Sequence, residues 1–328
     1  MPEIRKDLVT GRSVIIATER ANRPRHDGAS QESPCPFCAG NEQITPPEVF
    51  AYRDSQFSPD TPGWTVRVVP NKYPALVDEG MRSSSRRGLY ESTPGLGVHE
   101  VIIESPEHVV NVGELSEEQL AAVLRVYRER MLALRKDERW RSILLYKNQG
   151  AAAGATLEHV HSQLIALPET PEQLRAKIDG ARKYYEASGR CLFCEMIRQD
   201  TEGGARLVAD HARWVVLCPY AARFPFEIWI LPKRHAPYFE VSSDQDLAEL
   251  AHCLRDALAR FNRVLDHPPF NYLIHSHSLD GAEPRPYHWH IEILPKLVQV
   301  GGFEWGSGMF INPLAPEEAA RLLRQVAL

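Results

Sequence analysis

Runs of apolar side chains along the first half of the chain predict several strands and one long helix. WTVRVVPNKYP (64–74) and HEVIIESPEH (99–108) are short apolar runs that include a proline and contain β-branched residues, as strands often do. Residues 114–137 instead carry apolar side chains at helical spacing, with Ser116 as the candidate N-cap. Two further strands are predicted after this helix, over 142–148 and 158–168.

The second half of the chain repeats this order. Strands are predicted over 214–225 and 226–235, and a helix over 242–266 with Ser243 or Asp244 near its N-cap. Two more strands follow, over 270–276 and 287–295. Coincidence poorly explains so many elements in the same order, so we interpret the chain as two copies of one module.

The repeat leads to a prediction of fold class and domain organisation. We predict an α+β protein of two tandem modules, residues 1–175 and 176–328, each an antiparallel sheet with a long covering helix. The junction is expected near 170–188. The first half is longer mainly because of residues 77–97, whose Gly, Ser and Arg content indicates a mobile surface loop.

Composition narrows the class of protein. The chain has 328 residues, 43% hydrophobic and 25% charged, with a net charge of -5, which indicates a soluble globular protein rather than a nucleic-acid-binding one. No apolar stretch approaches the ~20 residues of a membrane span. The N-terminal MPEIRKDLVTGR is charged and lacks the apolar region of a signal peptide, so a cytoplasmic location with no membrane partner is expected.

Four of the six cysteines form two C-x-x-C pairs, CPFC and CLFC. In a reducing compartment such pairs are more often metal ligands or redox dithiols than structural disulfides. A two-residue spacer lets both thiolates reach one tetrahedral zinc ion, and each half also has two histidines at matching positions. The predicted zinc sites are Cys35, Cys38, His108 and His159 in the first half, and Cys191, Cys194, His235 and His288 in the second.

The second set has competing ligands, because His275 and His277 could take the place of His288. Buried thiols without metal, beside hydrogen-bonded histidines, are the other interpretation of both sets. The duplication favours zinc, with two ions per chain, because it places the same residue types in the same order twice.

The stretch LEHVHSQLIALP (157–168) points most directly to chemistry. Alternate residues of a strand share one face, so His159, His161 and Gln163 are predicted to line up. If His159 binds zinc, the strand is fixed and His161 points the same way. A neutral imidazole is a competent nucleophile or general base, and a glutamine amide can donate to an anionic oxygen. Chance is the alternative in a chain with 13 histidines.

Two other segments suit a phosphate ligand. KNQGAAAGAT (147–156) is a loop of small residues whose backbone N–H groups can approach phosphate closely. ATERANRPRHD (17–27) offers Arg20, Arg23 and Arg25 for bidentate contacts to phosphate. Judged alone, the first is more commonly a plain turn, and the second is equally a solvated surface segment.

These motifs are similar to those of a known family. The H-x-H-S-Q sequence after an N-x-G-A-A-x-G loop, with C-P-F-C-x-G-N upstream, resembles the galactose-1-phosphate uridylyltransferases, a tandem-repeat branch of the histidine-triad superfamily. The resemblance extends from IRKDLVTGR to the C-terminal VGGFEWGSGMFINP. It implies two tandem histidine-triad-like modules and a homodimer. The implied activity is nucleotide transfer between a nucleotide sugar and a sugar 1-phosphate through a covalent nucleotidyl-histidine.

The resemblance also implies roles for individual residues. His161 matches the family nucleophile, and Gln163 the glutamine that hydrogen-bonds the nucleotidyl phosphate. Positions that resemble the nucleotide- and phosphate-contacting residues are Arg20, Arg23, Asn71, Asn148 and Thr156. The segment that resembles the one reaching the sugar from the partner subunit is Gly302, Phe303 and Glu304.

Some positions depart from the best-studied bacterial members. Val160 and Ser162 stand where those have proline and glycine, and CLFC replaces the second-half pattern that holds iron there, so a second zinc is expected. Both features resemble a plant-like offshoot that acts as an ADP-glucose phosphorylase or adenylyltransferase. In the second half His290 is followed by Ile291 and Glu292, and a carboxylate repels phosphate. No second active site is expected, and His290 is assigned to packing or a secondary metal site.

We therefore expect an enzyme, in the first place a UDP-glucose:hexose-1-phosphate uridylyltransferase, with ADP-glucose phosphorylase or adenylyltransferase as the alternative. Two hypotheses come from other classes. One is a non-catalytic nucleotide-binding or zinc-stabilised interaction protein, and the other is a simple hydrolase.

Overall fold

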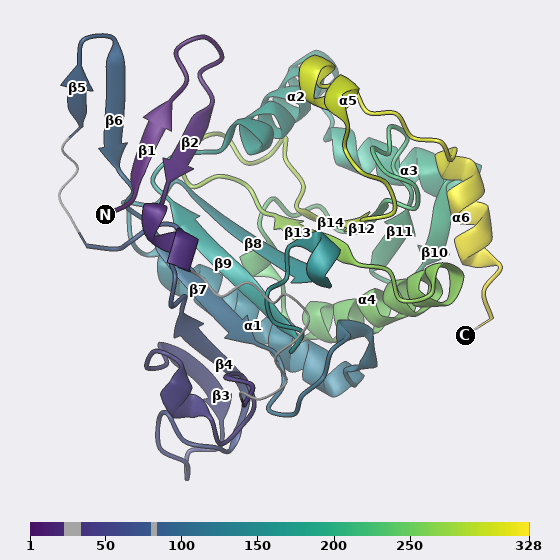
Figure 1. The fold of residues 1–328 in the computed structure, drawn as a ribbon. Coiled ribbons are helices and arrows are strands. Elements are labelled where there is room, and N and C mark those ends of the chain that lie inside the picture. Colours follow the sequence, from purple (N-terminus) through teal and green to yellow (C-terminus); the bar gives the residue numbers. More distant parts are fainter. Residues whose placement is uncertain (23–33, 80–83, 328) are drawn as a thin grey trace.

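The computed structural model describes residues 1–22, 34–79 and 84–327, and Figure 1 shows their fold. Arg23 and Arg25 lie outside the described residues. The centre of the molecule is one ten-stranded antiparallel sheet to which both halves contribute. In spatial order its strands are β10 (Leu207–Asp210), β11 (Trp214–Leu217), β12 (Ile228–Pro232), β14 (His290–Pro295), β13 (Phe270–His275), β8 (Ser142–Gln149), β9 (His161–Leu167), β7 (Val98–Ile103), β4 (Trp64–Pro70) and β3 (Phe50–Arg53).

Each half supplies five strands in the same spatial order, so the sequence repeat is also a structural repeat. From the outer edge inward the order is β3-β4-β7-β9-β8 in the first half and β10-β11-β12-β14-β13 in the second. The inner strands of the two halves pair with each other, with Lys147 of β8 opposite Tyr272 of β13. Separate sheets would leave β8 and β13 as edges with unpaired backbone groups, and joining them satisfies both. The predicted α+β class and tandem modules are confirmed, but the two predicted sheets form one.

Two long helices, α1 (Glu117–Arg135) and α4 (Asp244–Leu265), pack against each other and cover one face of this sheet (Figure 1). Both begin where the sequence predicts. The hydroxyls of Ser116 and Ser243 each accept from a backbone N–H of the first turn at 3.1 Å. Asp246 completes a capping box on α4, because its carboxylate accepts from the Ser243 N–H at 3.0 Å.

The opposite face of the sheet is covered differently in the two halves. In the second half, α2 (Glu172–Ser188) and α3 (Leu192–Gly203) pack Ile178 and Phe193 onto it. In the first half, the loop of residues 35–38 lies there and packs Phe37 in a cluster with strand residues. Helix α2 occupies much of the range in which the junction was predicted, and the boundary between 1–175 and 176–328 stays a prediction.

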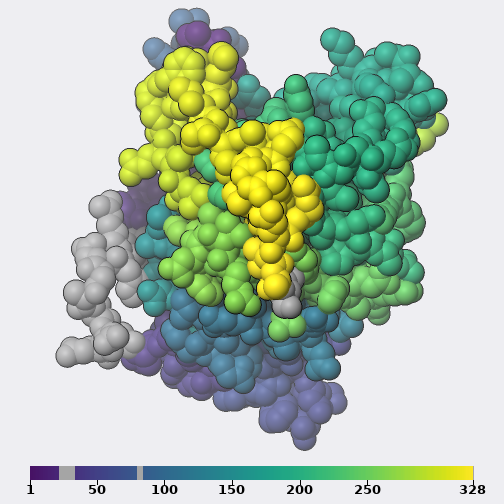
Figure 2. Space-filling model, turned by 90° about the vertical axis from the view of Figure 1, so that its right-hand side faces the viewer, coloured from purple at the N-terminus to yellow at the C-terminus, as the bar shows by residue number. Residues whose placement is uncertain are grey.

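Two short helices end the described chain, α5 (Gly302–Ser307) and α6 (Pro316–Arg324). Figure 2 shows the C-terminal segment at the surface, lying across the second half of the chain. The apolar side of α6 is buried in the main core, whereas Phe303 and Trp305 of α5 are 52% and 77% exposed. Among the helices of the described ranges, none combines the length and apolar character needed to cross a membrane.

A smaller sheet lies beside the first half, with the strand order β2-β1-β6-β5 (upper left of Figure 1). Its strands are β1 (Glu3–Lys6), β2 (Ser13–Ile16), β5 (Ser85–Arg87) and β6 (Tyr90–Pro94). The prediction of a loop over 77–97 is therefore wrong for much of its described part. Strands β5 and β6 are mostly exposed and polar, so they lack the apolar pattern that marks strands, and pairing with β1 stabilises them.

Candidate active site

The first predicted zinc set comes together on the face of the sheet opposite α1. Cys35 and Cys38 lie in a turn before β3, His108 follows β7, and His159 lies just before β9. Cys38 Sγ is 3.5 Å from His108 Nδ1 and 3.6 Å from His159 Nδ1, and Cys35 Sγ is also 3.6 Å from His159 Nδ1. The fold therefore gathers residues up to 124 positions apart around one point.

The second predicted set comes together in the same way. Cys191 is the N-cap residue of α3, His235 follows β12, and His288 precedes β14. Cys194 Sγ is 3.4 Å from His235 Nδ1 and 3.5 Å from His288 Nδ1. The competing histidines lie elsewhere: His275 groups with His290 and Glu292, and His277 Nδ1 donates to the Ser278 carbonyl at 2.8 Å. The prediction of His288 as the fourth ligand of the second set therefore agrees with the geometry.

Both groups have the dimensions of a tetrahedral zinc site. Zinc with ligand distances of about 2.3 Å to sulfur and about 2.1 Å to nitrogen places these atoms about 3.6 Å apart. The separations here are 3.4 to 3.6 Å. His159 Nε2 donates to the Ser105 carbonyl and His288 Nε2 to the Pro232 carbonyl, both at 2.8 Å. Nδ1 of each ring is then unprotonated and faces the cysteines, as a metal ligand must.

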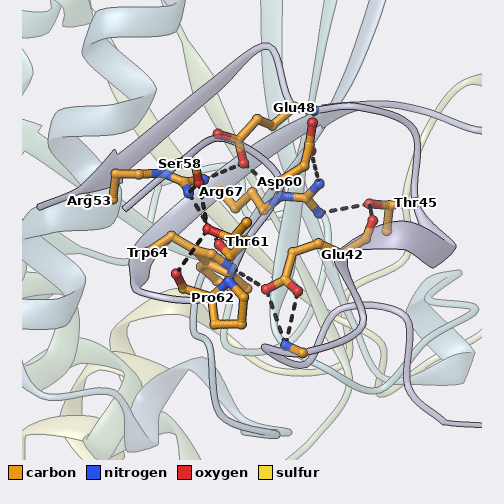
Figure 3. A network of polar contacts seen from close by, with 11 residues as sticks. Glu42, Thr45, Glu48, Arg53, Ser58, Asp60, Thr61, Pro62, Trp64 and Arg67 are labelled. Atoms are coloured by element: carbon orange, nitrogen blue, oxygen red, sulfur yellow. Dashed lines mark hydrogen bonds and ion pairs between the residues drawn. The ribbon is translucent and has the colours of Figure 1, made fainter. Parts of the chain in front are cut away.

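A buried polar network holds the segment that follows the first cysteine pair (Figure 3). The Glu42 carboxylate accepts from Trp64 Nε1 at 2.7 Å, which ties this segment to β4. Thr45 Oγ1 donates to the Glu42 carbonyl at 2.8 Å and accepts from Arg67 Nη1 at 2.7 Å. The buried Arg67 is in turn paired with two carboxylates. The first cysteine pair therefore lies next to a segment that side chains hold in place, whereas the second pair lies at the start of a helix.

His161 is the first residue of β9 and lies beside the first zinc set. Its side chain is 6% exposed, and its ring is 5.2 Å from that of Phe37, one of the two residues between the cysteines. Nδ1 donates to the His159 carbonyl at 2.7 Å, so Nε2 carries the lone pair, and among the described residues Nε2 has no hydrogen-bond partner. Burial, together with the nearby Lys147 ammonium, lowers the pKa of His161 to about 4. The ring is therefore neutral near pH 7, as a nucleophile requires.

The predicted alignment of three side chains on one strand face needs a correction. His159 precedes β9 and turns its ring toward the cysteines, so only His161 and Gln163 share a strand face. The reason is that the strand pairs with β7 only from His161 onward. His159 instead acts on His161 through its backbone carbonyl.

The side-chain oxygen of Gln163 has three donors around it. Oε1 is 3.0 Å from His99 Nε2, 3.1 Å from the Tyr146 hydroxyl and 3.4 Å from Asn71 Nδ2. His99 Nδ1 accepts from the Ala75 N–H at 3.0 Å, so Nε2 is its protonated, donating nitrogen. These donors occupy the oxygen and fix the orientation of the amide. The NH2 group of Gln163 is then the end available to an anion.

His99 and Tyr146 were not among the predicted site residues. Each is a polar side chain in a strand that contains apolar residues and other polar ones, and this polarity was the signal present in the sequence. That signal has no value without the strand register, which places Tyr146 directly opposite Gln163. His99 reaches Gln163 because β7 and β9 are neighbours in the sheet.

Two of the predicted phosphate-contacting residues lie beside Gln163. Asn71 contacts its side chain directly, as described above. Arg20 Nη1 donates to the carbonyl of Tyr73, whose N–H donates to Asn71 Oδ1 at 2.9 Å. Arg20 is therefore linked to the same cluster, while Arg23 lies outside the described residues.

The loop of small residues before β9 is tied to the second half. Asn271 Nδ2 of β13 donates to Asn148 Oδ1 and to the Ala153 carbonyl, both at 2.8 Å. Gly154 has φ of 91°, in the left-handed region that favours glycine. Thr156 is half-buried in this loop. Asn148 and Thr156 thus belong to the segment that leads toward β9, with the Asn148 oxygen already used.

Gly302, Phe303 and Glu304 are not brought to this site. They begin α5, and within the described chain no hydrogen bond or ion pair joins them to His161 or Gln163. Phe303 is more than half exposed, as noted above.

The corresponding face of the second half has different chemistry. His290, equivalent to His161, is fully buried and stacked on Trp229 with ring centroids 4.8 Å apart. Lys177 of α2 lies 3.1 Å from its Nε2 and pairs with Glu292, which is equivalent to Gln163, at 2.5 Å. Arg223 pairs with the other oxygen of Glu292 at 2.6 Å. The nitrogen that corresponds to the free Nε2 of His161 therefore already has an ammonium partner.

Two repeats joined in one sheet, a Cys2His2 group in each and a neutral histidine beside one of them define the two-module fold of histidine-dependent nucleotidyltransferases. Family models identify which of these it is. The N-terminal domain of galactose-1-phosphate uridyl transferase matches residues 2–171, and the C-terminal domain matches residues 177–327. The chain belongs to the galactose-1-phosphate uridylyltransferase family.

Curated relatives cover the whole chain. It is 37% identical to the ADP-glucose phosphorylase of Arabidopsis thaliana over 338 residues, which are 100% of this chain and 93% of that protein. It is 28% identical to the galactose-1-phosphate uridylyltransferase of Thermotoga maritima, over 99% of this chain and 98% of that protein.

Solved structures give the same result. The Arabidopsis thaliana ADP-glucose phosphorylase with bound ADP-glucose has a TM-score of 0.80 and 36% identity, over 100% of both chains. A uridylyltransferase structure has a TM-score of 0.83 and 28% identity, over 98% of this chain and 97% of that one. The resemblance deduced from the motifs is therefore confirmed.

Proposed function

We propose that this protein is a nucleotidyltransferase that acts on nucleotide sugars through a covalent nucleotidyl-His161 intermediate. The observation that carries the proposal is the arrangement of His161 and Gln163 on one strand face. His161 has a neutral ring with Nε2 free, and Gln163 has its oxygen occupied and its NH2 available. The first supplies a nucleophile, and the second stabilises the charge that develops on the phosphate.

The reaction has two half-reactions. In the first, His161 Nε2 bonds to the α-phosphorus of a nucleoside diphosphate hexose, and the bond from that phosphorus to the bridging oxygen breaks. Hexose 1-phosphate leaves with the electron pair. In the second, an acceptor oxygen attacks the phosphorus, and the bond to Nε2 breaks, which returns the neutral ring. A phosphate acceptor yields the nucleoside diphosphate, and a hexose 1-phosphate yields a new nucleotide sugar.

The remaining predicted residues fit contacts to the anionic oxygens. Asn148 can use its Nδ2, because its oxygen accepts from Asn271. The backbone of the small-residue loop, Thr156 and the arginines Arg20 and Arg23 supply further donors in this proposal. Asn71 is assigned to orienting Gln163, together with His99 and Tyr146.

Similarity suggests which substrates to test first. ADP-glucose with phosphate as acceptor comes first, because the relative that is 37% identical over the whole chain is an ADP-glucose phosphorylase. UDP-glucose with a hexose 1-phosphate is the second candidate, supported by the 28% identical uridylyltransferase. This order reverses the one expected from the motifs. The chemistry at His161 is the same for both.

Covalent labelling tests the proposal. The protein is incubated with ADP-glucose or UDP-glucose labelled at the α-phosphate, and acid-labile label is expected on the wild type and not on His161→Asn. Added phosphate or hexose 1-phosphate should discharge the label as ADP or as a nucleotide sugar. Absence of label with every nucleotide sugar would refute the mechanism. Nucleotide binding with unchanged affinity in His161→Asn and no label would identify a binding protein, and release of the nucleoside monophosphate without an acceptor would identify a hydrolase.

We also propose that each Cys2His2 group holds one zinc ion, two per chain. Four protein ligands close the coordination shell, so zinc supplies rigidity here and leaves no position for substrate. In the first group it holds His159, whose carbonyl fixes the tautomer of His161. Metal analysis by mass spectrometry of the purified protein should give about two zinc ions per chain.

A homodimer in the cytoplasm completes the proposal. The exposed residues Gly302, Phe303 and Glu304 would reach the sugar in the active site of the partner chain. The lack of any hydrogen bond or ion pair between these residues and His161 or Gln163 in the described chain supports this assignment, as does the exposure of Phe303 and Trp305.

A further inference from the structure

Strands β8 and β9 separate beside His161, whereas the equivalent strands of the second half stay paired. In the first half, the pairing ends with Tyr146 opposite Gln163. In the second half, β13 and β14 pair for two residues more, as far as His275 opposite His290. Because His290 is equivalent to His161, the missing pairs are those next to the proposed nucleophile. The separation lets the small-residue loop leave β8 at this point.

Lys147 takes the place of the missing pairing. Its ammonium donates to the His161 carbonyl oxygen at 3.0 Å. The same ammonium pairs with Glu104, the residue after β7, at 2.5 Å. The Lys147 and Glu104 side chains are 1% and 0% exposed, so a complete ion pair lies buried under the strand that carries His161.

Hydroxyl groups from three elements surround Glu104. Tyr127 of α1 donates to its carboxylate at 2.5 Å, and Ser162 of β9 donates to the same oxygen. The Tyr127 hydroxyl also contacts that of Tyr272, which comes from β13 of the second half. Burial alone raises the pKa of Glu104, but Lys147 and these hydrogen bonds outweigh it and lower that pKa, so the carboxylate is charged.

The second half builds the same fold without this network. The strand registers and helix caps identify the equivalent positions. They hold apolar residues: Ile274 for Lys147, Ile291 for Ser162 and Leu254 for Tyr127. All three are buried in the main core. Apolar replacement of a buried ion pair is often neutral or stabilising, so the module does not need the network to fold.

We propose that Lys147, held by Glu104, is a positioning residue for His161. It fixes the His161 backbone where pairing with β8 is absent, and so aims Nε2 at the phosphorus while leaving that side of the strand open to the small-residue loop. The inference rests on the proposed function, in which His161 is the nucleophile. A displacement of His161 Nε2 by about 1 Å can slow such a reaction about 100-fold. By holding the His161 backbone, Lys147 therefore affects the reaction rate, which its apolar equivalent in the second half does not.

The test uses a variant of the full-length protein with both charges removed, Lys147→Met with Glu104→Leu. Both positions become apolar, as Ile274 already is at the position equivalent to Lys147, so the variant is expected to fold. Single-turnover labelling with α-phosphate-labelled ADP-glucose or UDP-glucose, whichever labels the wild type, should be slowed about 10- to 100-fold at saturation. The half-saturating concentration should change less than about threefold, because the groups that bind nucleotide are intact.

A matched control exists in the second half. Lys177→Met with Glu292→Gln removes the other buried lysine–glutamate pair, and its labelling rate should stay within about twofold of the wild type. Equal slowing in this control, or a wild-type rate in the Lys147 variant, overturns the inference.

If the double variant does not fold, the labelling rate of Lys147→Arg is measured instead, because a guanidinium keeps the charge but not the single contact to the His161 carbonyl. About tenfold slowing supports the inference, and a wild-type rate overturns it. Failure to label the wild type refutes the proposed function instead.

Discussion

At the scale of single residues, one position separates the two halves chemically. Gln163 and Glu292 occupy the same place on equivalent strands, two residues after the second histidine. Around Gln163 the neighbours are donors to an oxygen, which leaves an NH2 group for an anion. Around Glu292 the neighbours are cations that neutralise it. An amide can donate to a phosphate, whereas a carboxylate repels it, so the proposed function predicts that the two copies differ in activity at this position.

Gln163→Glu tests that difference. The donors around the side chain would hold the new carboxylate ionised, and its charge would repel the phosphate of the nucleotide sugar. The single-turnover labelling rate should fall about 100- to 1,000-fold, with the melting temperature almost unchanged. Glu292→Gln at the equivalent position is the control and should leave the labelling rate unchanged. Retention of more than a tenth of the wild-type rate in Gln163→Glu would show that the amide is not needed.

At the scale of elements, the two cysteine pairs lie on supports of different kinds. The first lies in a loop next to the Glu42–Arg67 network, close to His161. The second begins α3, close to His290, which has no free nitrogen. Although both groups have the same ligand types, the first is expected to affect catalysis and the second mainly stability.

Cys38→Ser and Cys194→Ser form the matched pair for this expectation. Each should lower the zinc content from about two ions per chain to about one and reduce the melting temperature. Only Cys38→Ser should also slow labelling of His161 strongly, because it frees His159. The measurements are metal content, thermal unfolding and single-turnover labelling at a temperature where both variants are folded. An equal loss of rate in both would mean that the two groups share one role.

The helix caps give a second prediction at this scale. Ser243 has a full capping box with Asp246, whereas Ser116 caps α1 by one hydrogen bond. Ser243→Ala should therefore lower the free energy of unfolding by about 1 to 2 kcal/mol, and Ser116→Ala by about 0.5 to 1 kcal/mol. Urea unfolding of both variants measures the difference. Equal losses would show that the second bond of the Ser243 hydroxyl, which it donates to the Asp246 carboxylate at 2.8 Å, contributes nothing.

At the scale of the whole molecule, the open question is how α5 relates to the active site. Mixing two inactive variants answers it. His161→Asn lacks the nucleophile, and Glu304→Ala lacks a side chain proposed to serve the partner. In a mixed dimer one of the two sites has both residues, so random reassortment should restore about a quarter of the wild-type activity. Each variant alone should stay inactive, and no recovery after mixing would place Glu304 outside the partner's site.

Much of the fold and the core of the site followed from the sequence. The duplicated C-x-x-C and H-x-H motifs predicted the two Cys2His2 groups, because each half repeats the same residue types in the same order. The long helices and inner strands were predictable from apolar spacing and serine caps. Strands β5 and β6 were not, because exposed, polar strands are defined by pairing rather than by their own composition.

The motifs did not predict the residues that orient the site. His99 and Tyr146 act through the register of β7, β8 and β9, which no local pattern encodes. Lys147 and Glu104 are charged residues in apolar surroundings, and from sequence alone a buried pair cannot be told from two solvated side chains. Tyr272, whose hydroxyl contacts that of Tyr127 in the same network, comes from the other half of the chain.

The sequence by itself determined the repeat, the identity of the metal-ligand sets, and the difference between H-x-H-S-Q and H-x-H-I-E, since these depend only on residue type and order. The tertiary structure decided how the copies join, which nitrogen of each histidine is free, and which way the Gln163 amide points. Those properties depend on hydrogen bonds between residues distant in the chain. The structure alone also shows that β8 and β9 separate next to His161 and that a buried lysine takes the place of their pairing, because both depend on strand register.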